Sequence, residues 1–131
     1  MVKKVLNGRA VAVLGNADWS SEQLWKIQPI SDEESSFYCD AQGNIYRYNA
    51  KRKKMSSINP RERGRKNLEV AIHFKNSTKN FLVKYLIALA IFPYVRFTQN
   101  RVGHLDGNLM NNKVDNIFVD ITIEERDKNI Y

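Results

Sequence analysis

Residues 102–119 carry the polar side chains of this sequence that are best suited, by type and spacing, to form a catalytic site. It places one histidine, two aspartates, two glycines and four asparagines between two short apolar segments. Glycine, asparagine and aspartate tolerate left-handed backbone and bond their own main chain, so residues 103–116 are predicted to form a polar loop. A histidine at the rim of a strand that enters such a loop is suited to a metal-dependent hydrolytic site.

Three elements must position that histidine. One strand is predicted to end at Val102, and a second strand is predicted over residues 117–119. The segment Thr122-Ile-Glu-Glu125 matches a capping box, in which a hydroxyl and a carboxylate satisfy the first free amides of a helix. The expected order is strand, polar loop, strand and helix, which is a frame suited to a metal-dependent nuclease site.

The pattern His-x-Asp-Gly-Asn-x-x-Asn-Asn-x-x-x-Asn, followed by an apolar residue, resembles the ββα-metal motif of HNH homing endonucleases, a family common in phage genomes. The pattern is long and its spacing is specific. The matching positions are His104, Asp106, Gly107, Asn108, Asn111, Asn112 and Asn116.

Earlier parts of the chain carry the same resemblance. Glu22-x-x-Trp25-Lys26-x-Ile, and the hairpin predicted around Gly43, resemble the small module that precedes HNH domains in many such endonucleases. Residues 83–93 resemble a helical segment of the family, although Lys84 stands where the family has histidine. The resemblance covers residues 22–126.

The resemblance implies roles for the motif residues. His104 corresponds to the general base, since a neutral imidazole titrates near pH 6.5 and can accept a proton from water. Asn116 corresponds to the asparagine that ties the polar loop to the second strand. The loop is expected to be braced by side-chain-to-backbone bonds, with ordinary turn formation as the alternative for each asparagine. These structural loop residues are Gly107, Asn108, Asn111 and Asn112.

The metal ligands are where the sequence departs from the family. The family places Asp, Asn or His directly before the general base, and Gly103 cannot ligate. The family's second ligand falls at Glu125 or Arg126, and Glu125 also fits the reciprocal partner in the capping box. Asp106 and Glu125 are therefore the candidate ligands for Mg²⁺ or another divalent cation if the protein is active. Otherwise no cofactor is expected.

Positive charge is concentrated in one part of this +7 chain. Residues 47–66, the basic segment, carry nine basic side chains against Glu62, so the remainder is close to neutral. Pro60, Gly64 and the serines predict a mobile loop. A merely solvated loop is the alternative, but concentration of charge beside a hairpin favours binding to the phosphates of double-stranded DNA. Tyr46 and Tyr48 can stack on bases or sugars. The candidate nucleic-acid-binding residues are Arg47, Lys51, Arg52, Lys53, Lys54, Arg61, Arg63, Arg65 and Lys66.

The expected fold is α+β, with a small β-hairpin lobe followed by a ββα-metal (HNH-like) motif packed on a buried helix. Residues 1–18 are read as an N-terminal β extension, 19–66 as the module with hairpin and basic loop, and 67–131 as the HNH-like region. Strands are predicted over 2–6, 10–14, 37–40, 44–48 and 68–74. A nearly all-apolar helix is predicted over 81–92, ended by Pro93.

Composition restricts the setting. Cys39 is the single cysteine, which excludes an intramolecular disulfide. No signal peptide is recognised, and the longest apolar run is too short to span a bilayer. We expect no membrane association and a location in the cytoplasm of a bacterial host.

Three functions remain open. Gly103 favours a DNA-binding HNH-like protein, encoded by a phage or mobile element, in which cleavage is impaired or lost. The first alternative is an active metal-dependent nicking or homing endonuclease that uses His104. The second alternative is a regulatory protein that acts on a host protein partner.

Overall fold

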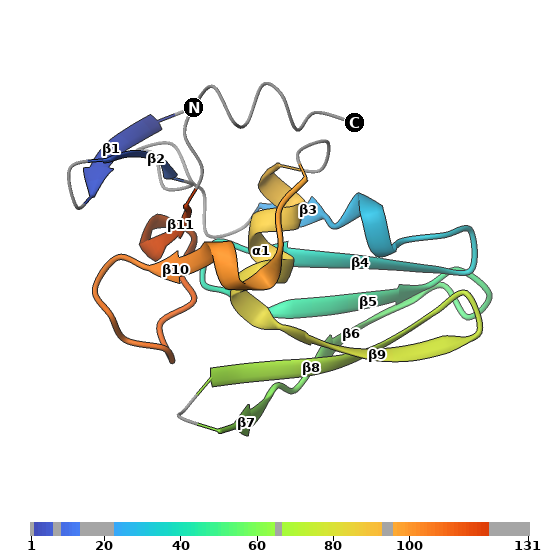
Figure 1. Cartoon of the computed structure of the whole chain (residues 1–131). Coiled ribbons are helices and arrows are strands. Elements are labelled where there is room, and N and C mark those ends of the chain that lie inside the picture. The colour runs from blue at the N-terminus through green and yellow to red at the C-terminus, as the bar shows by residue number, and fades with distance from the viewer. Residues whose placement is uncertain (1, 7–8, 14–22, 65–66, 93–95, 121–131) are drawn as a thin grey trace.

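The computed structural model describes residues 2–6, 9–13, 23–64, 67–92 and 96–120, which form three antiparallel sheets and one α-helix (Figure 1). Sheet A has the order β1 (Val2–Leu6), β2 (Arg9–Val13), β11 (Ile117–Val119) and β10 (Val102–His104). Sheet B has the order β3 (Leu24–Lys26), β4 (Ser35–Asp40), β5 (Ile45–Asn49) and β6 (Lys54–Ile58). Sheet C has the order β7 (Arg61–Arg63), β8 (Asn67–Phe74) and β9 (Ser77–Leu82). The helix is α1 (Val83–Ile91), and short 3₁₀ turns are η1 (Gln28–Ile30), η2 (Gln99–Arg101) and η3 (Val114–Asn116).

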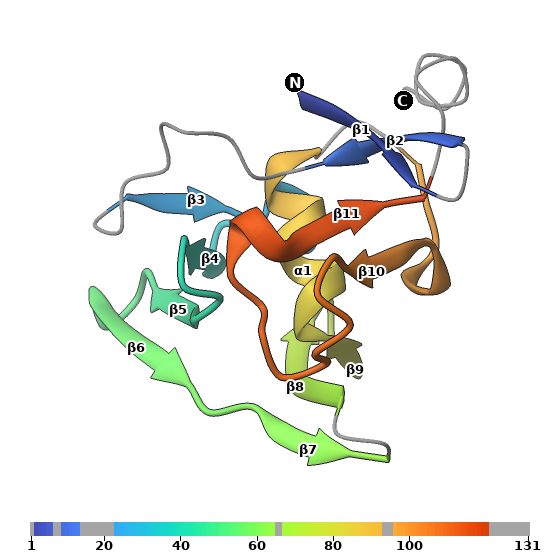
Figure 2. The same ribbon diagram turned by 90° about the vertical axis from the view of Figure 1, so that its left-hand side faces the viewer.

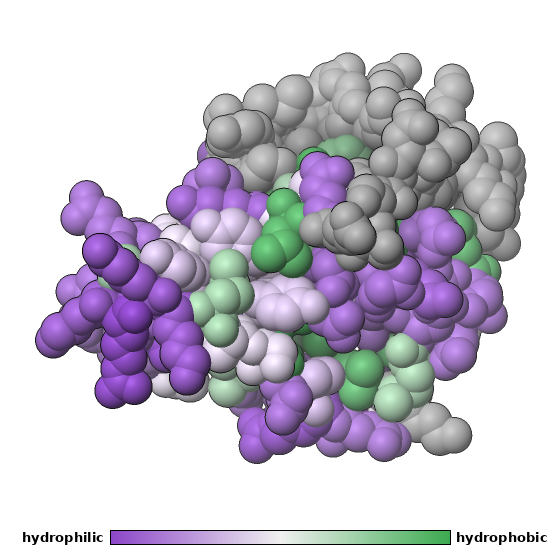
Figure 3. Space-filling view, turned by 180° about the vertical axis from the view of Figure 1, so that it is seen from behind, coloured by the Kyte–Doolittle hydropathy of each residue, from purple (hydrophilic) through white to green (hydrophobic). Residues whose placement is uncertain are grey.

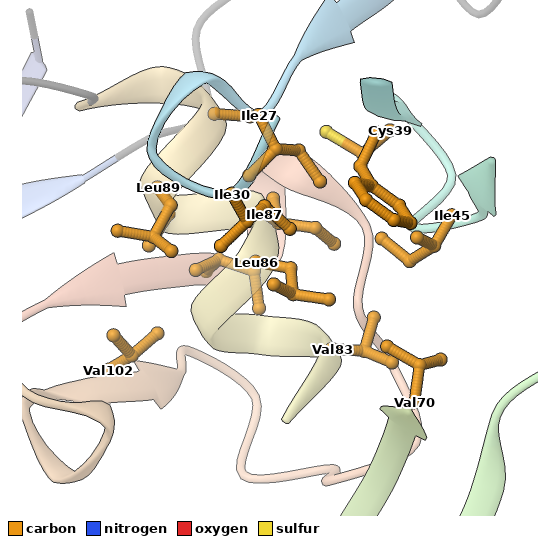
Figure 4. Packing of buried hydrophobic residues seen from close by; sticks show 14 of the residues in the cluster. Ile27, Ile30, Cys39, Ile45, Val70, Val83, Leu86, Ile87, Leu89 and Val102 are labelled. Carbon is orange, nitrogen blue, oxygen red and sulfur yellow. The ribbon is translucent and has the colours of Figure 1, made fainter. Parts of the chain in front are cut away.

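Helix α1 lies at the centre of the molecule, with strands of all three sheets around it (Figure 2). Its apolar side chains are buried on almost every face, because sheets A, B and C each contribute residues to one core. Figure 4 shows Leu86 and Ile87 of the helix among Ile27, Ile30 and other buried residues of this core. Within the described residues, no helix is long and apolar enough to cross a membrane.

The predicted helix over 81–92 is too long at its start. Residues 77–82 form strand β9, and the helix begins only at Val83. The turn from β8 into β9 is made by Lys75 and Asn76, which both have positive φ, as in tight hairpins. Pairing with β8 satisfies the backbone of residues 77–82 and so overrides the apolar run that suggested a longer helix.

The prediction that residues 47–66 form a mobile loop is wrong. Strand β6 pairs with β5 and strand β7 pairs with β8, so much of the basic segment is extended backbone within two sheets. Only one edge of each strand is bonded, and most of the side chains are in water. Like charges therefore cost little in these strands. Pro60 lies between β6 and β7, where no ladder bond needs its missing N–H.

The other predicted strands are present. The N-terminal hairpin, the hairpin around Gly43 and the strand over 68–74 all form, with ends within about two residues of the predictions. Strand β2 pairs with β11, so the N-terminal hairpin and the region around His104 share sheet A. The division into segments 1–18, 19–66 and 67–131 stays a prediction.

Candidate functional site

Strand β10 begins at Val102, where the sequence predicted the first strand to end, and it pairs with β11. The two strands hold between them the site loop, residues 105–116. Buried Asn116 ties the two ends of this loop together. Its Nδ2 donates to the backbone oxygen of Asn111 at 2.8 Å and to Oδ1 of Asp106 at 2.9 Å. Its Oδ1 accepts from the N–H of Asp106 at 3.1 Å, and its backbone oxygen accepts from Leu105 at 2.7 Å. One amide side chain therefore fixes the loop to the end of β11.

The Asp106 carboxylate is used within the site loop. Its Oδ1 also accepts from the N–H of Asn108 at 2.8 Å, and its Oδ2 accepts from Nδ2 of Asn111 at 2.9 Å. Hydrogen bonds from Asn111, Asn108 and Asn116 hold the pKa of Asp106 below its ordinary value. Asn108 in turn accepts from the N–H of Met110, and Gly107 adopts positive φ. Asn108 and Asn111 accept side-chain-to-backbone bonds within the loop, as the sequence suggested, whereas the Asn112 side chain bonds to His104 instead.

His104 is buried at the rim of β10, with 8% of its surface exposed. Its Nε2 lies 2.8 Å from Oδ1 of Asn112. Because a carboxamide oxygen only accepts, Nε2 carries the proton and Nδ1 is the basic nitrogen of the neutral ring. Burial lowers the pKa of His104 and the charge of Lys84 lowers it further, against the opposing effects of Asn112 and Asp106. The imidazole is therefore held neutral in one tautomer.

The Nδ1 atom of His104 is enclosed. It and Nδ2 of Asn112 are buried, and neither has a hydrogen-bond partner within the part of the chain that the structure describes. A general base must reach the water whose proton it takes. In this conformation, His104 has the tautomer that a general base needs, but water cannot reach its Nδ1 atom.

Asn112 is held from outside the motif, by the turn of the β4–β5 hairpin. Ala41 accepts a backbone bond from Val114 at 3.0 Å, and Gly43 lies directly against the backbone of Asn112. A Cβ at position 43 would be 2.4 Å from the carbonyl oxygen of Asn112, and φ there is +91°. No local pattern in the sequence joins residue 43 to residue 112, so this support could not be predicted from the sequence.

Gly103 has no side-chain atom that could bind a metal, and it also has a packing role. It lies opposite Phe118 in the β10–β11 pair, and the Phe118 ring covers the space above it. A Cβ at position 103 would be 2.6 Å from Cζ of Phe118, so any larger side chain must displace the ring. The place before the histidine is filled by an aromatic ring.

The candidate divalent-cation site is not assembled by the residues that are described. Both carboxylate oxygens of Asp106 accept hydrogen bonds within the site loop, and Gly103 has no side-chain donor atom for a metal. No group of three or more His, Cys, Asp or Glu in the described ranges could hold a metal ion. Glu125 and the helix expected to begin at Thr122 lie outside the described residues. The described donor set does not fit a divalent cation.

The predicted phosphate-binding residues fall into three groups. Arg47 and Arg63 already have protein partners: Ser35 accepts from the Arg47 guanidinium, and Arg63 pairs with Glu69 at 3.3 Å. Arg65 and Lys66 lie outside the described residues. The others are exposed, most of them at the turn between β5 and β6. They are Lys51, Arg52, Lys53, Lys54 and Arg61.

Cys39 takes no part in this chemistry. It is buried in the core, and burial together with the charge of Asp40 raises its pKa to about 12. The thiol is therefore protonated and unreactive at neutral pH.

Comparisons with known proteins agree with this geometry at the level of the fold. No protein-family model and no curated protein matches this chain. A solved structure described as DNA binding and cleavage by the HNH homing endonuclease I-HmuI is similar, with a TM-score of 0.54 and 18% sequence identity. The similarity covers 82% of this chain and 56% of that chain, so this chain spans little more than half the length of the endonuclease chain. The fold of this sheet-rich protein is HNH-like.

Proposed function

We propose that this protein binds double-stranded DNA through its basic segment and keeps an HNH-like frame in which cleavage is impaired or lost. The observation that carries the proposal is the exposed run of cations at the β5–β6 turn and in β7, on a fold similar to that of a DNA-cleaving enzyme. A phage or mobile-element origin and a bacterial cytoplasm as the place of action rest on the family resemblance.

The distribution of charge supports phosphate binding. Lys51, Arg52, Lys53 and Lys54 follow one another along the chain, and all four are exposed. Hydrophilic residues gather at the end of the molecule that carries the β5–β6 turn (Figures 1 and 3). Binding of this kind releases condensed counterions and weakens as salt rises.

Two contacts support the loss of cleavage. The Phe118 ring fills the space over Gly103, where the family places a ligand. The Asp106 carboxylate is bonded within the site loop. A nuclease built from these residues needs a ligand from outside the described ranges, with Glu125 as the candidate.

A second candidate function is His104-dependent DNA nicking with Mg²⁺ or another divalent cation. The bond from His104 Nε2 to Asn112 favours it, because that bond leaves Nδ1 as the nitrogen that can accept a proton from water. A local rearrangement that uncovers Nδ1 when DNA binds would be required.

DNA binding is tested by fluorescence anisotropy with a labelled duplex over a range of salt concentrations. The variant Lys51→Gln/Arg52→Gln/Lys53→Gln is compared with Lys75→Gln/Lys79→Gln, which removes exposed cations from the β8–β9 hairpin. Log affinity falls as log salt rises, so the slope is negative. We expect the first variant to make this slope shallower by about 2 to 3, since each phosphate contact contributes about 0.9 to its magnitude. The control is expected to change the slope by less. Equal slopes for the two variants would contradict the assignment of this surface.

Cleavage is tested by nicking of supercoiled plasmid with Mg²⁺ or Mn²⁺, with wild type compared to His104→Ala. We expect no nicking that depends on His104. Metal-dependent nicking that disappears in His104→Ala would establish the second candidate instead. The absence of both nicking and salt-sensitive binding would exclude both DNA functions and leave the protein-partner hypothesis.

A further inference from the structure

The outer face of sheet B is an open surface rich in tyrosine. Phe37, Cys39 and Ile45 point into the core, so the residues that alternate with them along β4 and β5 point away from it. The outer face comprises Leu24, Lys26, Ser36, Tyr38, Asp40, Tyr46, Tyr48, Met55 and Ser57, of which Asp40 is buried. Sheet B lies at one side of the molecule with no described element over its outer side (Figure 2).

Three tyrosines lie next to one another on this outer face. Tyr38 and Tyr46 are directly opposite across the β4–β5 pair, and Tyr48 follows Tyr46 by two residues on the same strand. Opposed side chains in such a pair start about 5 Å apart, and successive side chains on one face about 7 Å apart. All three tyrosines are half-buried, so their rings form one surface. Leu24 and Met55, exposed at 42% and 40%, extend it at either edge.

Part of this surface is rigid before any ligand binds. The Tyr46 hydroxyl donates to Oδ2 of Asp40 at 2.8 Å, and the same carboxylate accepts from two backbone amides of the following turn. The Tyr46 ring is thereby tethered to the hairpin that also supports Asn112. A ring held in place loses less conformational freedom when a ligand stacks on it.

Cations border the outer face on two sides. Lys26 of β3 lies opposite Tyr38 in the β3–β4 pair, and the turn that carries Lys51, Arg52 and Lys53 joins β5 to β6 at another edge. The acidic turn over 32–34 instead lines a separate hollow with Arg47 and His73. In Figure 3, residues of intermediate hydropathy cover the middle of this side of the molecule, and strongly hydrophilic residues flank them. Aromatic rings bordered by cations suit a ligand with flat apolar groups on an anionic backbone.

We infer that the outer face of sheet B binds unpaired nucleotide bases, by stacking them on Tyr38, Tyr46 and Tyr48 while the bordering cations contact the phosphates. This inference rests on the proposed DNA binding and deepens it, since the ligand at this face is a single-stranded segment. Every base has a π-face, so stacking of this kind tolerates different sequences, whereas bases inside a duplex are already stacked. The outer face of sheet B therefore recognises unpaired bases, while the cations of the β5–β6 turn recognise phosphates of the same nucleic acid.

The test compares a labelled oligothymidine with a labelled duplex by fluorescence anisotropy, using Tyr48→Leu and its matched control Tyr48→Phe. Leucine removes the ring but keeps an apolar side chain, and phenylalanine keeps the ring. We expect Tyr48→Leu to weaken oligothymidine binding by about 5- to 100-fold, and Tyr48→Phe by less than about threefold. The salt dependence is expected to be unchanged, since no cation is removed. Tyr38→Leu, at a second position on the same face, is expected to act in the same way.

The outcomes separate this inference from the proposed function. Duplex binding together with oligothymidine binding that Tyr48→Leu and Tyr38→Leu leave unchanged would overturn the inference and preserve the proposed function. A loss of binding to both ligands with normal urea unfolding would also overturn it, because the rings would then serve the duplex. A change from dimer to monomer in Tyr48→Leu would assign the face to contact between copies of this chain and overturn the inference. Failure of wild type to bind either ligand would overturn both.

Discussion

The site loop and the basic segment differ in what their polar groups bond to. In the site loop, Asp106 and Asn116 bond to the loop itself, and His104 bonds to Asn112. In the basic segment, most charged side chains extend into solvent from edge strands and a turn. A group whose bonds are already made within the protein is poorly placed to bind a ligand, whereas an exposed cation keeps its capacity. The site loop, which carries the resemblance to HNH endonucleases, is therefore the region with fewer polar groups left to bind a ligand.

This contrast also exists within the basic segment. Arg47 and Arg63 are bonded to Ser35 and Glu69, while the lysines of the β5–β6 turn are exposed. A basic residue count treats all of these side chains alike. The structure predicts that their contributions to DNA binding are unequal.

Removing Asn116 gives the largest expected effect. Asn116→Ala deletes three hydrogen bonds that a buried side chain makes to Asp106 and to the backbone of Asn111. We expect a loss of about 2 to 4 kcal/mol in the free energy of unfolding, measured with urea. Asn108→Ala, at an exposed position in the same loop, is expected to cost less than about 1 kcal/mol. Equal losses would show that the loop is not organised around Asn116.

Two glycine substitutions separate the cost of backbone strain from the cost of overpacking. Gly43 and Gly107 both have positive φ, but a Cβ meets the Asn112 backbone at position 43 and nothing within 4 Å at position 107. Gly107→Ala is expected to cost about 1 kcal/mol from backbone strain alone. Gly43→Ala is expected to cost about 2 to 3 kcal/mol, since overpacking adds to that strain. Urea unfolding of the two variants measures the difference, and similar values would remove the hairpin turn as a support of Asn112.

The pH dependence of stability tests whether His104 is held neutral. Its pKa in the folded protein lies below the ordinary value of 6.5, because burial and then Lys84 disfavour the cation more than Asn112 and Asp106 favour it. The unfolded chain therefore takes up a proton first as pH falls, and stability decreases below about pH 6.5. We expect the free energy of unfolding to fall between about pH 7.5 and about pH 5 in wild type, and to fall less in His104→Gln.

The control for that measurement is His73→Gln, because His73 is exposed on β8 and bonds to Thr78. His73→Gln removes the other histidine of the chain, so comparing the two variants isolates the contribution of His104. The Asp106 carboxyl does not interfere, since its pKa is below 3.8 and its contribution is lost only at lower pH. A profile for His104→Gln that matches wild type would mean that the imidazole is not held neutral by the fold.

The last comparison sets an ion-paired cation, Arg63, whose side chain is 65% exposed, against a cation of the β5–β6 turn. Arg63→Gln is expected to weaken duplex binding by less than about twofold, since its guanidinium is paired with Glu69. Lys53→Gln, at the exposed turn, is expected to weaken it by about three- to fivefold at moderate salt. Anisotropy titrations with one duplex compare the two. Equal effects would indicate that the Arg63–Glu69 pair opens at no cost when DNA binds.

Local sequence patterns were enough to predict several strands, the buried helix and part of the bonding within the site loop. The strands on both sides of the site loop follow from apolar segments beside turn-forming residues, and the hairpin around Gly43 follows from the same chemistry. The buried helix follows from an apolar run that no amphipathic surface helix would carry. The bracing of the loop by asparagine was also predictable, because those bonds join residues close in the chain.

The remaining features depend on how strands pair and how sheets pack, which short-range sequence patterns do not specify. Strands β6, β7 and β9 exist through pairing with neighbours, which no local pattern announced. The contact of Gly43 with Asn112 joins distant segments, and the Phe118 ring over Gly103 and the pairing of Tyr38 with Tyr46 depend on strand register. Sequence specifies the groups and local turns; packing of sheets around α1 determines which groups are enclosed and which face solvent.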